Sequence, residues 1–127
     1  MGRMNHAEFT CSVQPTYLED QSNPARHEYT FAYTVTIVNT GKVPAQLIGR
    51  HWVISDATGH VEEVRGLGVV GQQPLLQPGE SYEYTSGSSL TTPIGTMKGT
   101  YQMVAEDGTH FEAEIPEFVL ATPRALH

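Results

Sequence analysis

The sequence has little of several features that mark specialised proteins. Its 127 residues include a single cysteine, Cys11, so no disulfide can form within the chain, and a reducing, cytoplasmic location is expected. No apolar run approaches the roughly 18 residues of a membrane-spanning helix. The first residues, MGRMNHAEFT, also lack the apolar stretch of a secretory signal. We therefore expect neither a membrane span nor a secreted protein.

Basic residues are scarce as well. The chain has 7 Lys and Arg against 14 Asp and Glu, which gives a formal net charge of −7. Proteins that bind nucleic acid use Lys and Arg to neutralise phosphates, so this balance argues against such a role. It weakly favours cations over anions as ligands.

Motifs for catalysis or metal binding are also missing. None of the six histidines has a metal-ligand spacing, no second cysteine exists, and no nucleophile motif occurs. Glu62 and Glu63 are adjacent in an expected strand, so they point to opposite faces and are poorly placed to share a proton or a substrate. We predict a protein that is not an enzyme and has no cofactor. Whether metal binds stays open, because His51 or His60 could meet Asp56 or one of these glutamates through space.

What the sequence does have is alternation of apolar and polar residues, which is the two-residue period of half-buried strands. The clearest case has Tyr29, Phe31, Tyr33, Val35 and Ile37 on one face, and we expect that face to form much of the core. Strands are expected over residues 8–14, 27–39, 46–55, 60–65, 80–86, 96–106 and 111–120.

Turn residues separate these segments. Residues 56–59 fit a type I turn, and Asp107-Gly108 is a strong hairpin signal. Pro15 is expected to end the first strand, and residues 86–95 are expected to form a Ser/Gly/Pro loop. Pro116 lies where the apolar parity of the last strand switches, which predicts a bulge on an edge strand.

These patterns predict one all-β domain over residues 1–127, with a core at about 8–123 and loose ends. Seven or eight short strands without a helical period favour an antiparallel β-sandwich of immunoglobulin or fibronectin type III kind. A small closed barrel is the alternative. Edge strands could pair two copies into a homodimer, and the sequence does not choose between that and a monomer.

The segment 66–71, GLGVVG, matches the G-x-G-x-x-G fingerprint of dinucleotide-binding proteins. The fingerprint needs a helix after the glycines, and Gln72-Gln73-Pro74 follows instead, so that interpretation is not favoured. Gly66, Gly68 and Gly71 could instead form an anion-binding nest with Arg65 before it. The more economical interpretation is that they provide unusual backbone angles.

The run Arg50-His51-Trp52 is the other candidate binding surface, because Arg and Trp dominate binding hot spots. The apolar residues around it occupy both odd-numbered and even-numbered positions of the expected strand, so one face of the strand must accept a polar group. We expect Trp52 to point inward and Arg50 to lay its stem along the core edge with its head in water. The simpler alternative is a core tryptophan beside an edge arginine.

Several segments in combination resemble the ApaG family. They are residues 46–52 (QLIGRHW), 66–74 (GLGVVGQQP), Pro78-Gly79, 82–84 (YEY), Thr92-Pro93 and the pattern of Gly95, Met97, Gly99 and Tyr101. The resemblance implies a fibronectin type III-like sandwich associated with cobalt resistance and magnesium efflux. Related domains occur in eukaryotic F-box and polymerase-interacting proteins, where they are supposed to bind proteins. The family offers no catalytic residues to carry over.

Two functional hypotheses follow. The first is a non-enzymatic accessory module that binds an unknown protein partner or a small phosphate-bearing ligand, with an indirect effect on divalent cations. Its candidate residues are Arg50, His51, Trp52, Arg65, Gly66, Gly68 and Gly71. A bulky residue at Gly68 is then expected to weaken capture but leave folding largely intact. The second hypothesis is direct divalent-metal binding, or hydrolysis of a phosphorylated small molecule, near residues 56–63.

Overall fold

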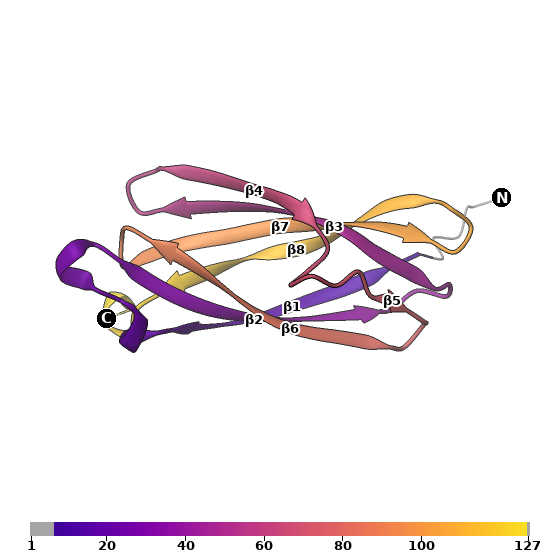
Figure 1. Ribbon diagram of the computed structural model, residues 1–127, viewed down its shortest axis with the longest axis horizontal. Helices are drawn as coiled ribbons and strands as arrows, with labels where there is room; N and C mark the ends of the chain where they lie inside the picture. Colours follow the sequence, from indigo (N-terminus) through magenta and orange to yellow (C-terminus); the bar gives the residue numbers. More distant parts are fainter. Residues whose placement is uncertain (1–6, 127) are drawn as a thin grey trace.

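The computed structural model describes residues 7–126 and consists of two stacked antiparallel sheets (Figure 1). One sheet has the order β1-β2-β6, and the other has the order β4-β3-β7-β8 with the short β5 paired to β3. The strands are β1 Phe9–Tyr17, β2 Tyr29–Asn39, β3 Ala45–Asp56, β4 Val61–Leu67, β5 Leu75–Leu76, β6 Ser81–Leu90, β7 Ile94–Ala105 and β8 His110–Ala121. Three 3-10 turns complete the described chain: η1 Glu19–Gln21, η2 Pro24–Arg26 and η3 Pro123–Leu126. The predicted antiparallel sandwich is confirmed, and the closed barrel is wrong because the sheets are separate.

The core is the space between the two sheets, and the alternation of β2 builds one wall of it. Phe31, Tyr33, Val35 and Ile37 are each at most 5% exposed, whereas the alternate threonines face water. Tyr29 lies at the end of the strand and is only partly buried. The predicted core face of this strand is therefore confirmed.

Trp52 of β3 lies at the centre of this core and is 2% exposed. Its ring centroid is 5.3 Å from that of Tyr33, 6.0 Å from that of Phe118 and 6.4 Å from that of Tyr101. All three contacts are edge-on, which is a favoured geometry for aromatic pairs. The inward orientation expected for Trp52 is confirmed.

A bulge in β3 explains why its sequence shows apolar residues on both parities. Leu47 pairs with Met103 of β7 and Gly49 pairs with Gln102, so Ile48 is an extra residue in β3. Leu47 is buried before the bulge, and Trp52 is buried after it on the opposite parity. The bulge thereby turns Arg50 to the same side as Trp52.

Pro15 does not end β1, contrary to expectation. The strand continues to Tyr17, and Pro15 pairs with Tyr33 of β2. The Glu8 carbonyl accepts from the Thr40 N–H just after β2, and the Leu18 N–H donates to the Thr30 carbonyl of β2. The backbone groups of even-numbered β1 residues therefore point toward β2, and those of odd-numbered residues point away from it. The N–H that proline lacks would point away from the sheet, and its absence costs no hydrogen bond.

The expected loop at residues 86–95 is also wrong except at residues 91–93, because β6 continues to Leu90 and β7 begins at Ile94. Gly87 pairs with Ala32 of β2, and Leu90 is 5% exposed and belongs to the core. Small polar residues suggested a loop here, yet they form a regular strand: Gly87 and Ser89 are exposed, whereas Ser86 and Ser88 alternate with them and are partly buried. Ser89, for example, is 3.3 Å from Thr30 between hydroxyl oxygens.

The predicted turns have the expected geometry. Asp56 Oδ1 accepts hydrogen bonds from the backbone N–H groups of Thr58 and His60, which closes the β3–β4 hairpin. Gly108 has a φ of 87° in the β7–β8 hairpin. The bulge predicted at Pro116 is present on the edge strand β8, between the residues that pair with Met97 and Gly99 of β7. Within the described residues, no helix has the length and apolar character needed to span a membrane.

Candidate functional site

The glycine loop, residues 66–72, includes the last two residues of β4 and leads toward β5. It runs from the sheet that contains β4 toward the sheet that contains β6 (Figure 1). Val69 and Gln72 exchange two backbone hydrogen bonds of 2.8 and 3.0 Å, which leaves Val70 and Gly71 as a two-residue turn. Val70 has a φ of 48° and Gly71 a φ of 79°. Positive φ at both central residues defines a type I′ turn, where Asn-Gly is the favoured pair.

Each glycine of the motif has a local steric reason. A Cβ on Gly66 would lie 2.8 Å from Arg50 Nη1, so this glycine leaves room for the guanidinium. A Cβ on Gly68, whose φ is 65°, would collide with the backbone carbonyl of Gln72. Gly71 has open space around it and is needed only for its positive φ. Backbone conformation and close packing therefore account for the three glycines.

Arg50 holds the loop in place. Its Nη1 donates hydrogen bonds of 3.0 Å to the Leu67 carbonyl and 2.9 Å to the Gly68 carbonyl. Its charge also acts on the hydroxyls of Tyr33 and Tyr84, which lie on β2 and β6. The head was expected to lie in water; β3 instead turns Arg50 toward the loop, and the two carbonyls hold its Nη1, one of them in an exposed contact and the other part-buried.

Much of the loop's hydrogen-bonding capacity is used within the protein. The Gly68 N–H donates to the Ile48 carbonyl at 2.7 Å, and the N–H groups of Val69 and Gln72 bond to each other's carbonyls. Gln73 Nε2 donates to the same Ile48 carbonyl. An anion nest needs successive N–H groups that are free to converge on one ligand. Among residues 68–72 of the described chain, the N–H groups of Val70 and Gly71 are the two without a backbone partner.

The glycine loop and the adjoining β5 expose apolar side chains. Leu67 is 77% exposed, Val70 is 62% exposed and Leu75 is 58% exposed, while Val69 between them is fully buried. We call Leu67, Val70 and Leu75 the loop surface. None of these residues was predicted from the sequence to belong to a binding surface, although a β-branched valine directly before a turn glycine was a readable signal.

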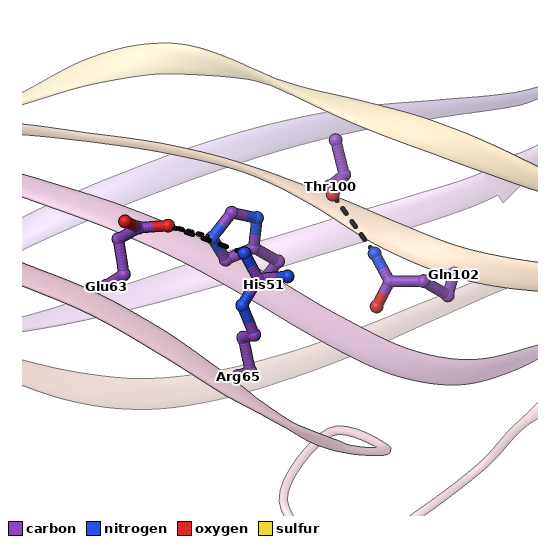
Figure 2. A network of polar contacts seen from close by, with 5 residues as sticks. All are labelled: His51, Glu63, Arg65, Thr100 and Gln102. Atoms are coloured by element: carbon purple, nitrogen blue, oxygen red, sulfur yellow. Dashed lines mark hydrogen bonds and ion pairs between the residues drawn. The ribbon is translucent and has the colours of Figure 1, made fainter.

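His51 lies on the outer face of the sheet, away from Arg50 and Trp52. Figure 2 shows His51 Nε2 beside Glu63 Oε1, at 2.7 Å, and Arg65 Nη2 reaching the same oxygen at 3.6 Å. Gln102 Nε2 donates to Thr100 Oγ1 on the same face, at 3.1 Å. Arg50 hydrogen-bonds to the glycine loop, His51 contacts Glu63, and Trp52 is buried in the core. The structure therefore divides the three consecutive residues among three environments.

Candidate metal ligands do not converge in the part of the chain that the structure describes. Within residues 7–126, no three His, Cys, Asp or Glu side chains are grouped to hold an ion. The Asp56 carboxylate is occupied by its own turn, and hydrogen bonds from Thr58 foremost, with His60 and Thr91, lower its pKa. His6 and His127 lie outside the described residues.

The buried hydroxyl and thiol groups are held in their neutral forms. The Tyr84 and Tyr101 hydroxyls hydrogen-bond to each other in the core, and burial raises the pKa of both well above the ordinary value. Burial also raises the pKa of the Cys11 thiol to about 11. A buried neutral thiol is a poor nucleophile, since the thiolate is the reactive form.

Comparison with known proteins shows which family this chain resembles in sequence. The profile described as the ApaG domain matches residues 19–105. Protein ApaG of Dechloromonas aromatica is 68% identical over 127 residues, which is 100% of both chains. The chain belongs to the ApaG family. Protein ApaG of Nitrosospira multiformis is 62% identical over 120 residues, or 94% of each chain.

Solved structures of ApaG-like proteins share the fold. The crystal structure of a Bordetella pertussis protein has 61% identity and a TM-score of 0.90, covering 93% of this chain and 96% of that one. A second X-ray structure has 50% identity and a TM-score of 0.89, covering 94% and 91%. The predicted membership of the ApaG family is therefore confirmed.

Proposed function

We propose that the chain is a non-enzymatic binding module that captures a protein partner through the loop surface of Leu67, Val70 and Leu75. The observation that carries this proposal is Val70, an exposed β-branched residue held at a φ of 48°. Such a conformation costs of order 1–3 kcal/mol, and strained residues cluster at functional sites. Folding gains little from an exposed valine here, so the residue is better explained by contact with another molecule.

The chemistry of the loop favours a protein over a phosphate-bearing ligand. Leu67 and Val70 of the loop and Leu75 of β5 expose apolar side chains, and the N–H groups of Gly68, Val69 and Gln72 already donate within the chain. Arg50 is committed to two loop carbonyls. Arg65 lies on the outer face beside Glu63. Clustered exposed apolar side chains with a polar surround are typical of protein interaction sites.

The loop is also built to keep one shape. Arg50 ties two consecutive carbonyls, the Val69–Gln72 pair closes the turn, and the buried Val69 side chain anchors it to the core. A surface ordered before binding loses less conformational entropy when the partner arrives. The loop surface therefore has the preorganisation expected of a recognition element.

The second hypothesis, direct metal binding or hydrolysis of a phosphorylated small molecule, has less support. The groups near residues 56–63 provide one close pair, His51 with Glu63, and the Asp56 carboxylate is taken up by its turn. A divalent cation needs several converging oxygen or nitrogen ligands. An effect on cobalt or magnesium, as the family resemblance implies, would then be indirect and pass through the protein partner.

Site-specific photo-crosslinking in the native host tests this proposal. A photoreactive residue replaces Leu67 in one strain and Val61 in another. Val61 is 54% exposed and lies on β4 with Leu67, but at the opposite end of the strand. We expect one discrete crosslinked protein from position 67 and none of the same mass from position 61. The same product from both positions, or none from position 67, would count against the loop surface.

A bulky residue at Gly68 is not a clean test. Its Cβ would collide with the Gln72 carbonyl, so the substitution would disturb the loop itself as well as any partner contact.

A further inference from the structure

Three of the four sheet edges carry a feature that prevents another strand from adding to them. On β1, Pro15 stands at an outward-facing position and has no N–H to offer. On β8, Pro116 lies within the bulge. On β4, the charged Glu62, Glu63 and Arg65 line a strand of 7 residues. Proline, bulges and charges are the usual protections of sheet edges.

The fourth edge, β6, is long and has none of these protections. Its 10 residues, SYEYTSGSSL, contain no proline and a single charged residue, Glu83. Thr36 Oγ1 donates to Glu83 Oε2 at 3.2 Å, which draws the carboxylate toward β2 and away from the open side. The edge is therefore open to a partner strand.

The backbone groups that face outward can be identified from the ladder. The Asn39 N–H donates to the Glu80 carbonyl, so the backbone groups of Glu80 point toward β2. Hydrogen-bonded positions alternate along an antiparallel strand. The outward positions are therefore Ser81, Glu83, Thr85, Gly87 and Ser89. Within the described residues, β6 pairs only with β2, and no turn or loop hydrogen bond reaches these five positions.

We propose that β6 pairs antiparallel with β6 of a second copy of this chain, about a two-fold axis at Thr85. In this register Thr85 faces itself, Glu83 faces Gly87 and Ser81 faces Ser89. All five outward positions are then opposed, which gives about ten ladder hydrogen bonds, two for each opposed pair. The three-stranded sheets of the two copies join into one continuous six-stranded sheet.

A second copy fits this edge because the strand is complementary to itself. The register places no two charged residues opposite each other, and like charges at such positions are destabilising. It also sets the glutamate against a glycine, so the side chain meets no steric opposition. Symmetric pairing of this kind is closed, which gives a dimer instead of a fibre. This proposal goes beyond the partner-binding function and uses no residue of the loop surface.

Sedimentation equilibrium of the full chain over a range of concentrations measures the dimer directly. We expect a mass that rises to twice the monomer mass. Because each copy has a net charge of −7, added salt should tighten the dimer by screening the repulsion between copies. Outward amides of β6 should also exchange more slowly with solvent in concentrated than in dilute samples.

Two lysine substitutions make the register itself testable. Thr85→Lys places two like charges at the axis and should weaken the dimer by about tenfold or more. Gly87→Lys places a lysine opposite Glu83 twice per dimer, and should tighten the dimer about tenfold. A Cβ at Gly87 makes only an ordinary 3.4 Å contact with the Phe31 carbonyl, so the fold should accept it.

Thr34→Lys is the matched control. It removes the same 2.8 Å contact between the Thr34 and Thr85 hydroxyls and adds the same charge one strand further in, so dimerisation should be unchanged. Circular dichroism confirms the fold of each variant. A chain that stays monomeric up to about 1 mM would overturn the proposal, since its dimerisation free energy would then be weaker than about 4 kcal/mol. So would a dimer that responds equally to Thr85→Lys and Thr34→Lys.

Discussion

Replacing Val70 with asparagine should make the protein more stable while removing part of its proposed binding surface. Val70 has a φ of 48° and precedes Gly71 in a type I′ turn. Left-handed backbone costs an ordinary residue about 1–2 kcal/mol, and asparagine much less. The valine side chain is 62% exposed, so losing its burial costs only about 0.5 kcal/mol. The expected net gain in the free energy of unfolding is about 1 kcal/mol.

Thermal unfolding followed by circular dichroism measures this gain. For a domain of this size, 1 kcal/mol corresponds to a rise in Tm of about 3–5 °C. Leu75→Asn is the matched control, because Leu75 is similarly exposed at 58% but does not have a positive φ. The Tm of that variant should not rise.

The reasoning would be refuted if Val70→Asn left the Tm unchanged or lowered it, because the turn would then not be strained by valine. An equal rise for Leu75→Asn would also refute it, since the gain would come from surface polarity and not from the backbone. If the Tm rises, the natural valine makes the fold less stable than asparagine would at the same position. That is the pattern expected of a residue retained for binding.

Three further predictions concern the loop anchor, the core and alkaline pH. Arg50→Met should lower the free energy of unfolding by about 1–3 kcal/mol and speed amide exchange across the glycine loop, because two carbonyls lose a charged donor; unchanged exchange there would argue against the anchor. Gly99→Ala should cost about 3 kcal/mol in urea unfolding, because its Cβ would collide with the His51 carbonyl, whereas Gly87→Ala should be nearly neutral; similar losses would contradict the packing argument. Burial raises the pKa of Cys11 to about 11 and the pKa of Tyr101 further above its ordinary value, so the unfolded chain loses these protons first. The free energy of unfolding should therefore be unaffected below about pH 9 and fall above it, by up to about 1.4 kcal/mol per pH unit for each group; equal urea midpoints at about pH 8 and pH 11 would disprove this.

The sequence predicted the sandwich because its β-strands are half-buried, and half-burial leaves a two-residue period that can be read directly. The inward face of β2 and the inward Trp52 followed from that period. The two errors arose where local residue preferences depend on the neighbouring strand. Pro15 and the Ser/Gly run of β6 look like strand breakers, yet Pro15 lies at an outward edge position and the Ser/Gly run pairs residue by residue with β2. Neither position can be known before strand order and register are known.

The candidate site was only partly readable. Adjacent residues on a strand point to opposite faces, so Arg50, His51 and Trp52 could not form one surface, and alternation alone would have shown this. The bond between Arg50 and the loop carbonyls depends on the β3 bulge, which no local pattern indicates. Similarly, the left-handed Val70 is a property of the closed turn, and the sequence only hints at it by placing valine before glycine.

Affinity for the protein crosslinked at position 67 tests the central claim most directly. The purified partner is titrated calorimetrically into the wild-type chain, into the triple variant Leu67→Ser, Val70→Asn, Leu75→Ser, and into a Val61→Ser control at the opposite end of β4. The account predicts that the triple variant loses at least about tenfold in affinity, or 1.4 kcal/mol, while it keeps its fold and the control binds normally. Equal affinity of the wild-type chain and the triple variant would contradict it.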